Sequence, residues 1–249
     1  MSQITVKNPH SVYAILKTRP QDIIRLTLPS NIERSGEDAW VQVLELAKAK
    51  KIKISHAPHD PDSRRERKAN DGGRASIAEC LVKAREPVSA EELFSDAKEK
   101  REGRGLWIAL DCLQDPHNVG AIFRAASFFG VQGILLTQER SAPLTSTVYD
   151  VACGGVEYVP HALQVNLQQA FEIAKDSGLW ILGTSEHADQ SLENIESDRP
   201  WLLVLGNEEK GMRRLTTEAC DVICQIKPKG HVTSLNVSVA AGILISKLS

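Results

Sequence analysis

Polar side chains suited to binding a ligand follow three short apolar runs of this sequence, at 106–113, 201–205 and 222–227. The segments after these runs read DPHNVGAIFR, GNEEKGM and PKGHVTSLNVS. The first and third segments supply two amides, a guanidinium and a hydroxyl: Asn118, Arg124, Ser234 and Asn236. If the apolar runs are neighbouring strands of one sheet, these groups at the strand ends could bind a polar ligand.

Each of these residues also has an ordinary structural role. Asn118 could cap a helix, and either Ser234 or Asn236 could cap the last helix of the chain. Arg124 is the only Lys or Arg between residues 105 and 140, and it could simply extend its guanidinium to solvent. The residues alone therefore leave structural and functional interpretations open.

Several familiar chemistries lack their motifs in this chain. No G-x-G-x-x-G follows a strand, no G-x-S-x-G surrounds a serine, and no H-E-x-x-H is present. Gly206 and Gly211 have the spacing of a phosphate-binding loop, but Met212 and Arg213 replace the Lys-Ser/Thr pair that would bind phosphate and magnesium. These absences argue against a dinucleotide-binding fold, ATP or GTP hydrolysis, a serine hydrolase and a zinc protease.

The apolar pattern of the second half predicts an α/β domain. Short continuous apolar runs alternate with helical patterns, which is typical of a mostly parallel sheet covered on both faces. The predicted strands are 106–113, 133–137, 156–160, 180–184, 201–206 and 222–227. The predicted helices are 119–129, 167–177, 213–219 and 234–248.

The first half predicts a smaller α/β unit. Its expected elements are a helix at 9–18, a strand at 23–28, a helix at 37–50 and strands at 52–56 and 75–82. Residues 59–74 show no apolar periodicity, and the charged stretch 85–105 resembles a linker that carries one short helix. The expected organisation is therefore a domain at 1–84, a linker at 85–105 and a domain at 106–249.

Composition places this chain among ordinary globular proteins, with 249 residues, 42% hydrophobic and 25% charged. No apolar run reaches the roughly 18–20 residues of a membrane helix, and the first residues lack a secretory pattern. The five cysteines are odd in number and form no C-x-x-C, so we expect neither disulfides nor a zinc site. A cytoplasmic protein without a membrane segment or a bound metal is expected.

The net charge of −2 is unevenly distributed. Residues 1–105 carry 20 Lys and Arg against 16 Asp and Glu, whereas residues 106–249 carry 10 against 16. The basic excess is concentrated in two blocks, 48–53 and 64–68. Such blocks are usually solvated surface, but their concentration in one half permits an anionic partner such as a nucleic acid.

The three segments together closely resemble, in order and spacing, the signature motifs of the SpoU (TrmH-like) branch of the SPOUT methyltransferases. The matching stretches are DPHNVGAIFRAASFFGVQGI, LVLGNEEKGM and SLNVSVAAGI. The resemblance covers 106–249 densely. It reaches 1–84 more weakly, where NPHSVYAIL resembles the small ribosomal-protein-like substrate-binding domain of ribosomal RNA members. One departure is the lysine-containing turn at 227–230, where relatives commonly carry Pro-Met-x-Gly.

The resemblance implies an α/β fold with a deep trefoil knot, in which the last strands and helix pass through a loop. The walls of the knot form the S-adenosylmethionine pocket in this family. Carried onto this sequence, the backbone around Thr184, Gly206, Ile226 and Leu235 would hold that cofactor. No metal is implied.

The family reaction transfers the sulfonium methyl group to a ribose 2′-hydroxyl of RNA. The resemblance makes Arg124 the leading catalytic candidate, either in deprotonating the hydroxyl or in fixing the ribose. Asn118, Glu208, Ser234 and Asn236 match the other polar site residues of the family. His117 and His231 flank the site and are alternative bases.

The resemblance also implies a homodimer whose site is completed by the partner. The expected substrate is a guanosine of 23S ribosomal RNA, since the chain carries an N-terminal domain that shorter transfer RNA relatives often lack. Transfer RNA is the first alternative substrate. A non-catalytic RNA-binding or ribosome-assembly factor with the same fold is the second alternative.

Overall fold

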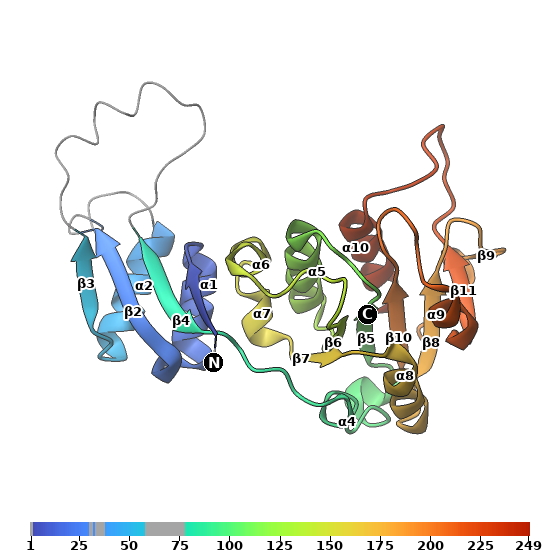
Figure 1. The fold of residues 1–249 in the computed structure, drawn as a ribbon, viewed down its shortest axis with the longest axis horizontal. Coiled ribbons are helices and arrows are strands. Elements are labelled where there is room, and N and C mark those ends of the chain that lie inside the picture. Colours follow the sequence, from blue (N-terminus) through green and yellow to red (C-terminus); the bar gives the residue numbers. More distant parts are fainter. Residues whose placement is uncertain (1, 30–31, 33–37, 58–77) are drawn as a thin grey trace. The chain divides into compact units, whose positions relative to one another are not determined.

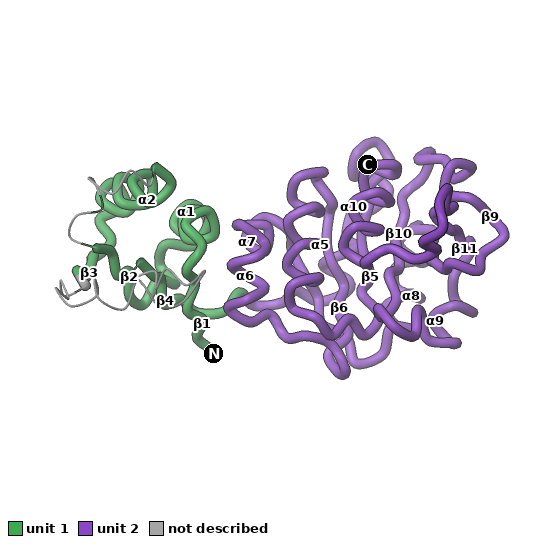
Figure 2. The backbone as a smooth tube through the Cα atoms, turned by 90° about the horizontal axis from the view of Figure 1, so that it is seen from above, with its two compact units in different colours: residues 1–85 green, residues 86–249 purple. Residues whose placement is uncertain are grey.

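The computed structural model describes residues 2–29, 32, 38–57 and 78–249. Backbone contacts divide the chain into two compact units, Met1–Arg85 and Glu86–Ser249 (Figure 2). The basic block 64–68, the stretch 59–74 and the first residues of the strand expected at 75–82 lie outside the described residues.

The first unit contains a four-stranded sheet in the order β1-β4-β2-β3. Its strands are β1 (Gln3–Val6), β2 (Ile23–Pro29), β3 (Ile54–Ala57) and β4 (Glu79–Lys83). Its helices are α1 (Pro9–Thr18), the 3-10 turn η1 (Pro20–Asp22) and α2 (Asp38–Ala49). The helices expected at 9–18 and 37–50 are confirmed, whereas β1 and η1 had no counterpart among the expected elements.

Local sequence explains where α1 begins. The side chain of Asn8 accepts hydrogen bonds from the backbone N–H groups of His10 at 2.9 Å and Ser11 at 3.3 Å. Pro9 occupies the first helical position, where a missing N–H costs nothing. Val12 and Ile15 then recur on the buried face, and both are fully covered. Their burial attaches the helix to the unit.

The second unit contains a seven-stranded sheet in the order β7-β6-β5-β10-β8-β11-β9, and every pairing in it is parallel. Its strands are β5 (Leu106–Leu110), β6 (Gly133–Thr137), β7 (His161–Gln164), β8 (Trp180–Thr184), β9 (Gln190–Ser191), β10 (Trp201–Leu205) and β11 (Val222–Gln225) (Figure 1). The α/β class with a mostly parallel sheet is therefore confirmed.

Helices cover both faces of this sheet. They are α4 (Ala90–Leu93), α5 (Pro116–Phe129), α6 (Ser146–Ala152), α7 (Gly155–Tyr158), α8 (Leu167–Asp176), α9 (Arg214–Ala219) and α10 (Val237–Leu248), with 3-10 turns η3 (Lys100–Gly103) and η4 (Leu192–Asn194). Figure 2 shows α5 and α10 on one side of the central strands and α8 and α9 on the other. All five residues of β5 are buried, as expected for a strand covered on both faces.

The strand expected at 156–160 is wrong. Residues Gly155–Tyr158 form α7, and the neighbouring strand β7 begins only at His161. A short apolar run is ambiguous between helix and strand, and here a close approach favours the helix. A Cβ atom on Gly155 would lie 2.5 Å from the carbonyl oxygen of Phe123, so glycine lets α7 lie directly against α5.

The stretch expected as a linker, 85–105, belongs almost entirely to the second unit. Leu93 and Phe94 are buried in the same hydrophobic cluster as Trp107 and Phe171. The indole N–H of Trp107 donates to the carbonyl oxygen of Leu93 at 2.9 Å. Leu93 and Phe94 attach the segment to the sheet, but they stand among charged residues, so the sequence did not indicate their burial.

Across the described ranges, no helix has both the length and the apolar character needed to cross a membrane.

Candidate functional site

The site begins where β5 ends and α5 starts. Asp115, rather than Asn118, caps α5, because its carboxylate accepts the backbone N–H of His117 at 2.8 Å. Pro116 follows at the first helical position. Asn118 therefore lies in the first turn, buried, with its amide available for contacts with other segments.

Asn118 joins the three motif segments through its side chain. Its amide nitrogen donates to Oε1 of Glu208 at 3.1 Å, and its amide oxygen accepts from Nδ2 of Asn236 at 3.0 Å. Asn236 in turn caps α10, since its oxygen accepts the backbone N–H of Ser238 at 2.9 Å. Three residues expected at the site thus form one hydrogen-bonded chain at the carboxyl edge of the sheet.

The loop that carries Glu208 folds back on itself after β10. The backbone N–H of Asn207 donates to the carbonyl oxygen of Gly211 at 3.0 Å, and the reverse bond measures 2.9 Å. Gly206 lies so close to the returning chain that a Cβ atom there would be 2.3 Å from the backbone nitrogen of Met212. Only glycine fits at this position, and the tight turn fixes the direction in which Glu208 leaves the loop.

A buried ion pair ties the same loop to β5. The side chain of Asp111 is completely buried, and its Oδ1 accepts from Nε of Arg213 at 2.7 Å. Its Oδ2 accepts the backbone N–H of Arg213 at 2.9 Å. Both carboxylate oxygens therefore have donors, which is what a buried charge requires.

Cys112 connects these two groups of contacts and is a poor candidate nucleophile. Burial, and next the nearby charge of Asp111, raise the pKa of its thiol, so the reactive thiolate is disfavoured at neutral pH. Its backbone contributes instead. With φ at 61° it turns the chain out of the strand, its N–H donates to the hydroxyl of Thr137 at 3.0 Å, and its carbonyl oxygen accepts from Asn207 at 2.9 Å.

Two expected site residues lie outside this chain of hydrogen bonds. Arg124 is exposed on α5, six residues after Asn118, which corresponds to about 9 Å along the helix axis. Ser234 is exposed just before α10. Within the described part of the protein, neither side chain makes a hydrogen bond. His117 and His231 are exposed as well.

The residues expected around a cofactor come from adjacent strands. Thr184 ends β8, Gly206 follows β10, Ile226 follows β11, and Leu235 precedes α10, while β10, β8 and β11 are neighbours in the sheet. From 226 to 235, residues that are all described, the backbone forms neither helix nor strand and no backbone–backbone hydrogen bond. Its N–H and C=O groups are thus available to a polar ligand. The segment can therefore bind a ligand through main-chain groups.

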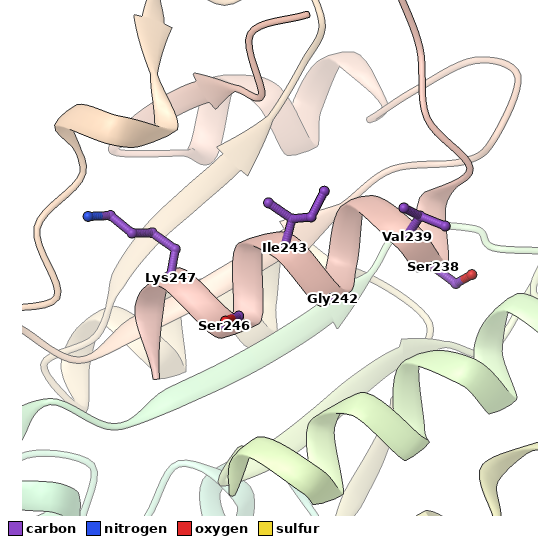
Figure 3. A pocket seen from close by; sticks show the side chains of 6 residues that line it. All are labelled: Ser238, Val239, Gly242, Ile243, Ser246 and Lys247. Atoms are coloured by element: carbon purple, nitrogen blue, oxygen red, sulfur yellow. The ribbon is translucent and has the colours of Figure 1, made fainter.

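Other candidate binding features lie elsewhere or are absent. Among the described residues, no group of three or more His, Cys, Asp or Glu side chains could hold a metal ion. An open depression of about 650 Å³ lies along the outer side of α10, where Val239 and Ile243 line it (Figure 3). Neither Asn118 nor Glu208 lines this depression, but Ser238 lines it and donates to Oδ1 of Asn236.

Three residues that organise this edge were not among the expected site residues: Asp111, Asn207 and Arg213. Asp111 directly follows an apolar strand, and an acidic residue at that position was a usable signal. Asn207 and Arg213 gave none, because their roles depend on partners about a hundred residues away in the sequence.

This chain is similar to known proteins in both sequence and fold. Residues 105–246 match the SpoU rRNA Methylase family. The chain is 37% identical over 242 residues to the 23S rRNA (guanosine-2′-O-)-methyltransferase RlmB of Pseudomonas aeruginosa, covering 96% of this chain and 93% of that protein. It is 38% identical over 204 residues to the putative TrmH family tRNA/rRNA methyltransferase YacO of Bacillus subtilis, covering 82% and 80%. The AdoMet-bound rRNA methyltransferase of Sinorhizobium meliloti shares the fold, with a TM-score of 0.76, 20% identity, and 99% and 86% of the chains covered.

Proposed function

This chain belongs to the SpoU rRNA methylase family, and we propose that it transfers a methyl group from S-adenosylmethionine to the 2′-hydroxyl of a guanosine in 23S ribosomal RNA. The observation that carries the proposal is the extent of the similarity. The relative from Pseudomonas aeruginosa matches across nearly the whole length of both chains, so both units, rather than the second alone, have counterparts in it.

The cofactor is held by the irregular backbone at the carboxyl edge. Main-chain groups around Thr184, Gly206, Ile226 and Leu235 bind it, and the free N–H and C=O groups of 226–235 support this assignment. The hydroxyl of Thr184 donates to the carbonyl oxygen of Val204 at 3.0 Å, which fixes the end of β8 beside β10. S-adenosylmethionine, when bound, supplies an activated methyl group. The protein therefore has to orient the attacking ribose and accept its proton.

Arg124 is the proposed catalytic residue. Its exposed guanidinium offers up to five N–H donors, which suit a ribose oxygen and an adjacent phosphate. Because arginine stays protonated in proteins, we assign it the orientation of the ribose. Asn118, Glu208 and Asn236 hold the surrounding segments together, and Ser234 faces the solvent side where the cofactor and RNA arrive.

We also propose that the segment from β10 to α10 is threaded as a deep trefoil knot. Two features support this: β10 lies between β5 and β8, and α10 returns to contact both α5 and β10. The first unit is proposed to be a ribosomal-protein-like domain that binds RNA. Its exposed lysines at 48, 50, 51 and 53 suit phosphate contacts. Action on ribosomal RNA would place the protein in the cytoplasm.

A homodimer is proposed through the outer side of α10. Val239 is 51% exposed and Ile243 41% exposed, and both line the depression in Figure 3. A second copy of this chain would cover these apolar side chains and bring its own edge near the site.

The test is methyl transfer from tritiated S-adenosylmethionine to unmodified 23S ribosomal RNA and, separately, to unmodified transfer RNA. Methylated riboses are then mapped by their resistance to alkaline cleavage. A labelled guanosine ribose in 23S RNA alone supports the proposal. Label in transfer RNA alone would show that transfer RNA, rather than 23S ribosomal RNA, is the substrate. Binding of RNA and cofactor without label in either would indicate a non-catalytic RNA-binding factor.

A further inference from the structure

We propose that Asn207 is a positioning residue that holds the carboxylate of Glu208 against Asn118. This inference rests on the proposed methyl transfer, because its consequence is measured in that reaction. Among the described residues, Asn207 makes no hydrogen bond to Arg124 or to the cofactor segment 226–235. It acts through Glu208.

The first argument is the donor geometry. Nδ2 of Asn207 donates to Oε2 of Glu208 at 3.2 Å and to the carbonyl oxygen of Cys112 at 2.9 Å. The other carboxylate oxygen, Oε1, accepts from Nδ2 of Asn118 at 3.1 Å. The carboxylate is thus held between two amide nitrogens, one on each oxygen, and one of these amides is also bonded to the end of β5.

The second argument is that Asn207 cannot rotate without breaking its own loop. Its Oδ1 accepts the backbone N–H groups of Glu209 at 3.1 Å and Lys210 at 3.2 Å. Turning the amide over would place this oxygen against the Glu208 carboxylate and the Cys112 carbonyl, and would point the NH₂ group at two N–H donors. The surrounding groups therefore allow one orientation of the amide.

The consequence is that Glu208 depends on its neighbour. Glu208 is exposed, and a glutamate on an exposed loop loses considerable rotamer freedom when it is held in place. Without the second amide donor, the carboxylate is held by Asn118 alone. Asn118 also binds Asn236, so losing the Asn207 donor would also loosen the hydrogen bond at the start of α10.

The substitution Asn207→Asp separates positioning from loop folding. Aspartate keeps an oxygen that can accept from Glu209 and Lys210, but it replaces the donor with a second carboxylate oxygen facing Glu208. We expect kcat to fall about tenfold, the equivalent of one lost hydrogen bond to a charged group. The KM for RNA and the Tm should stay close to their wild-type values.

The pH dependence gives a readout that a purely structural role would not move. Two carboxylates in contact bind a shared proton as the pH falls, and the protonated one then donates to the other. The activity of Asn207→Asp relative to wild type should therefore rise as the pH is lowered from about 7 to about 5. A defect in loop folding would lower this ratio equally across the range.

The matched control is Asn166→Asp. Asn166 caps α8, accepting the backbone N–H of Gln168 at 3.0 Å, so the same chemical change is made at a cap that no carboxylate contacts. Asn166→Asp should leave kcat unchanged, and its activity relative to wild type should not vary with pH. The inference would be overturned if Asn207→Asp kept the wild-type kcat. It would also be overturned if the loss of kcat did not depend on pH or came with a matching fall in Tm. A wild-type protein that methylates no RNA would instead refute the proposed function.

Discussion

Removing the guanidinium of Arg213 should destabilise the second unit considerably more than removing the charge of Asp111. In Arg213→Met, the aliphatic stem is retained, but the fully buried carboxylate loses its donor at 2.7 Å. Breaking a buried ion pair by deleting one partner costs about 3–5 kcal/mol. Here the backbone N–H of residue 213 still donates to Oδ2, and the lost guanidinium was 46% exposed. We therefore expect a cost at or just below the lower end of that range, about 2–3 kcal/mol.

Asp111→Asn should cost less, about 1–2 kcal/mol, because it removes the buried charge that needs compensation. The remaining penalty comes from an amide NH₂ that faces a former donor, while Arg213 can turn into solvent. In the double variant Asp111→Asn/Arg213→Met, no uncompensated charge remains, so its cost should be well below the sum of the two single costs. This coupling is the quantity that a double-mutant cycle isolates.

The assay is urea unfolding followed by tryptophan fluorescence, which reports mainly on the second unit because three of the four tryptophans lie there. The m-value should stay constant, so that a lower midpoint reflects lower stability. A cost below about 0.5 kcal/mol for Arg213→Met, or additive costs in the double variant, would refute the view that Asp111 is charged and supported by this arginine.

Three further outcomes are expected. Arg124→Ala should abolish methyl transfer to RNA and leave the calorimetric affinity for S-adenosylmethionine within a few-fold; near-normal turnover would remove Arg124 from its assigned role. Burial raises the pKa of the Cys224 thiol to about 11 from a usual 9.0, so the folded state keeps a proton that the unfolded state releases above pH 9. The free energy of unfolding should then fall as the pH rises from about 9 to about 11, and the fall should be smaller in Cys224→Ala; equal slopes would contradict the burial effect. Replacing Lys50, Lys51 and Lys53 with Gln should make the plot of log association constant for RNA against log salt concentration less steep, by about 0.7–0.9 in slope per lost phosphate contact. An unchanged slope would show that these lysines do not contact RNA.

The strands β5, β6, β8, β10 and β11 of the second unit were predictable because each is a short apolar run in the sequence, whereas β7 and β9 were not predicted. Runs such as Gly133–Thr137 and Trp180–Thr184 are bounded by polar or turn residues and coincide with β6 and β8. The failure at 156–160 had a physical reason. Whether that run forms helix or strand depends on how closely Gly155 approaches α5, and this distance is a tertiary property.

The site was predictable at the level of segments and less so at the level of contacts. Asn118, Glu208 and Asn236 lie in the three segments that stood out, and they meet in one chain of hydrogen bonds. Asn118 was a possible cap of α5 because asparagine and aspartate are nearly equivalent caps, and only the structure shows that Asp115 fills that role. The contact of Asn207 with Cys112 could not be inferred, since no local pattern encodes it.

Asn236 has one neighbour in the polar chain and another along the backbone, and this dual position imposes a thermodynamic reciprocity. Its side chain reaches Asn118, while its main chain continues directly from the segment proposed to hold the methyl donor. By linkage, if a ligand on that segment favours the closed Asn118–Glu208 contact by some factor, the closed contact increases the affinity for the ligand by the same factor. Measuring how the ligand changes the closure of this contact would therefore also give the effect of the contact on ligand affinity.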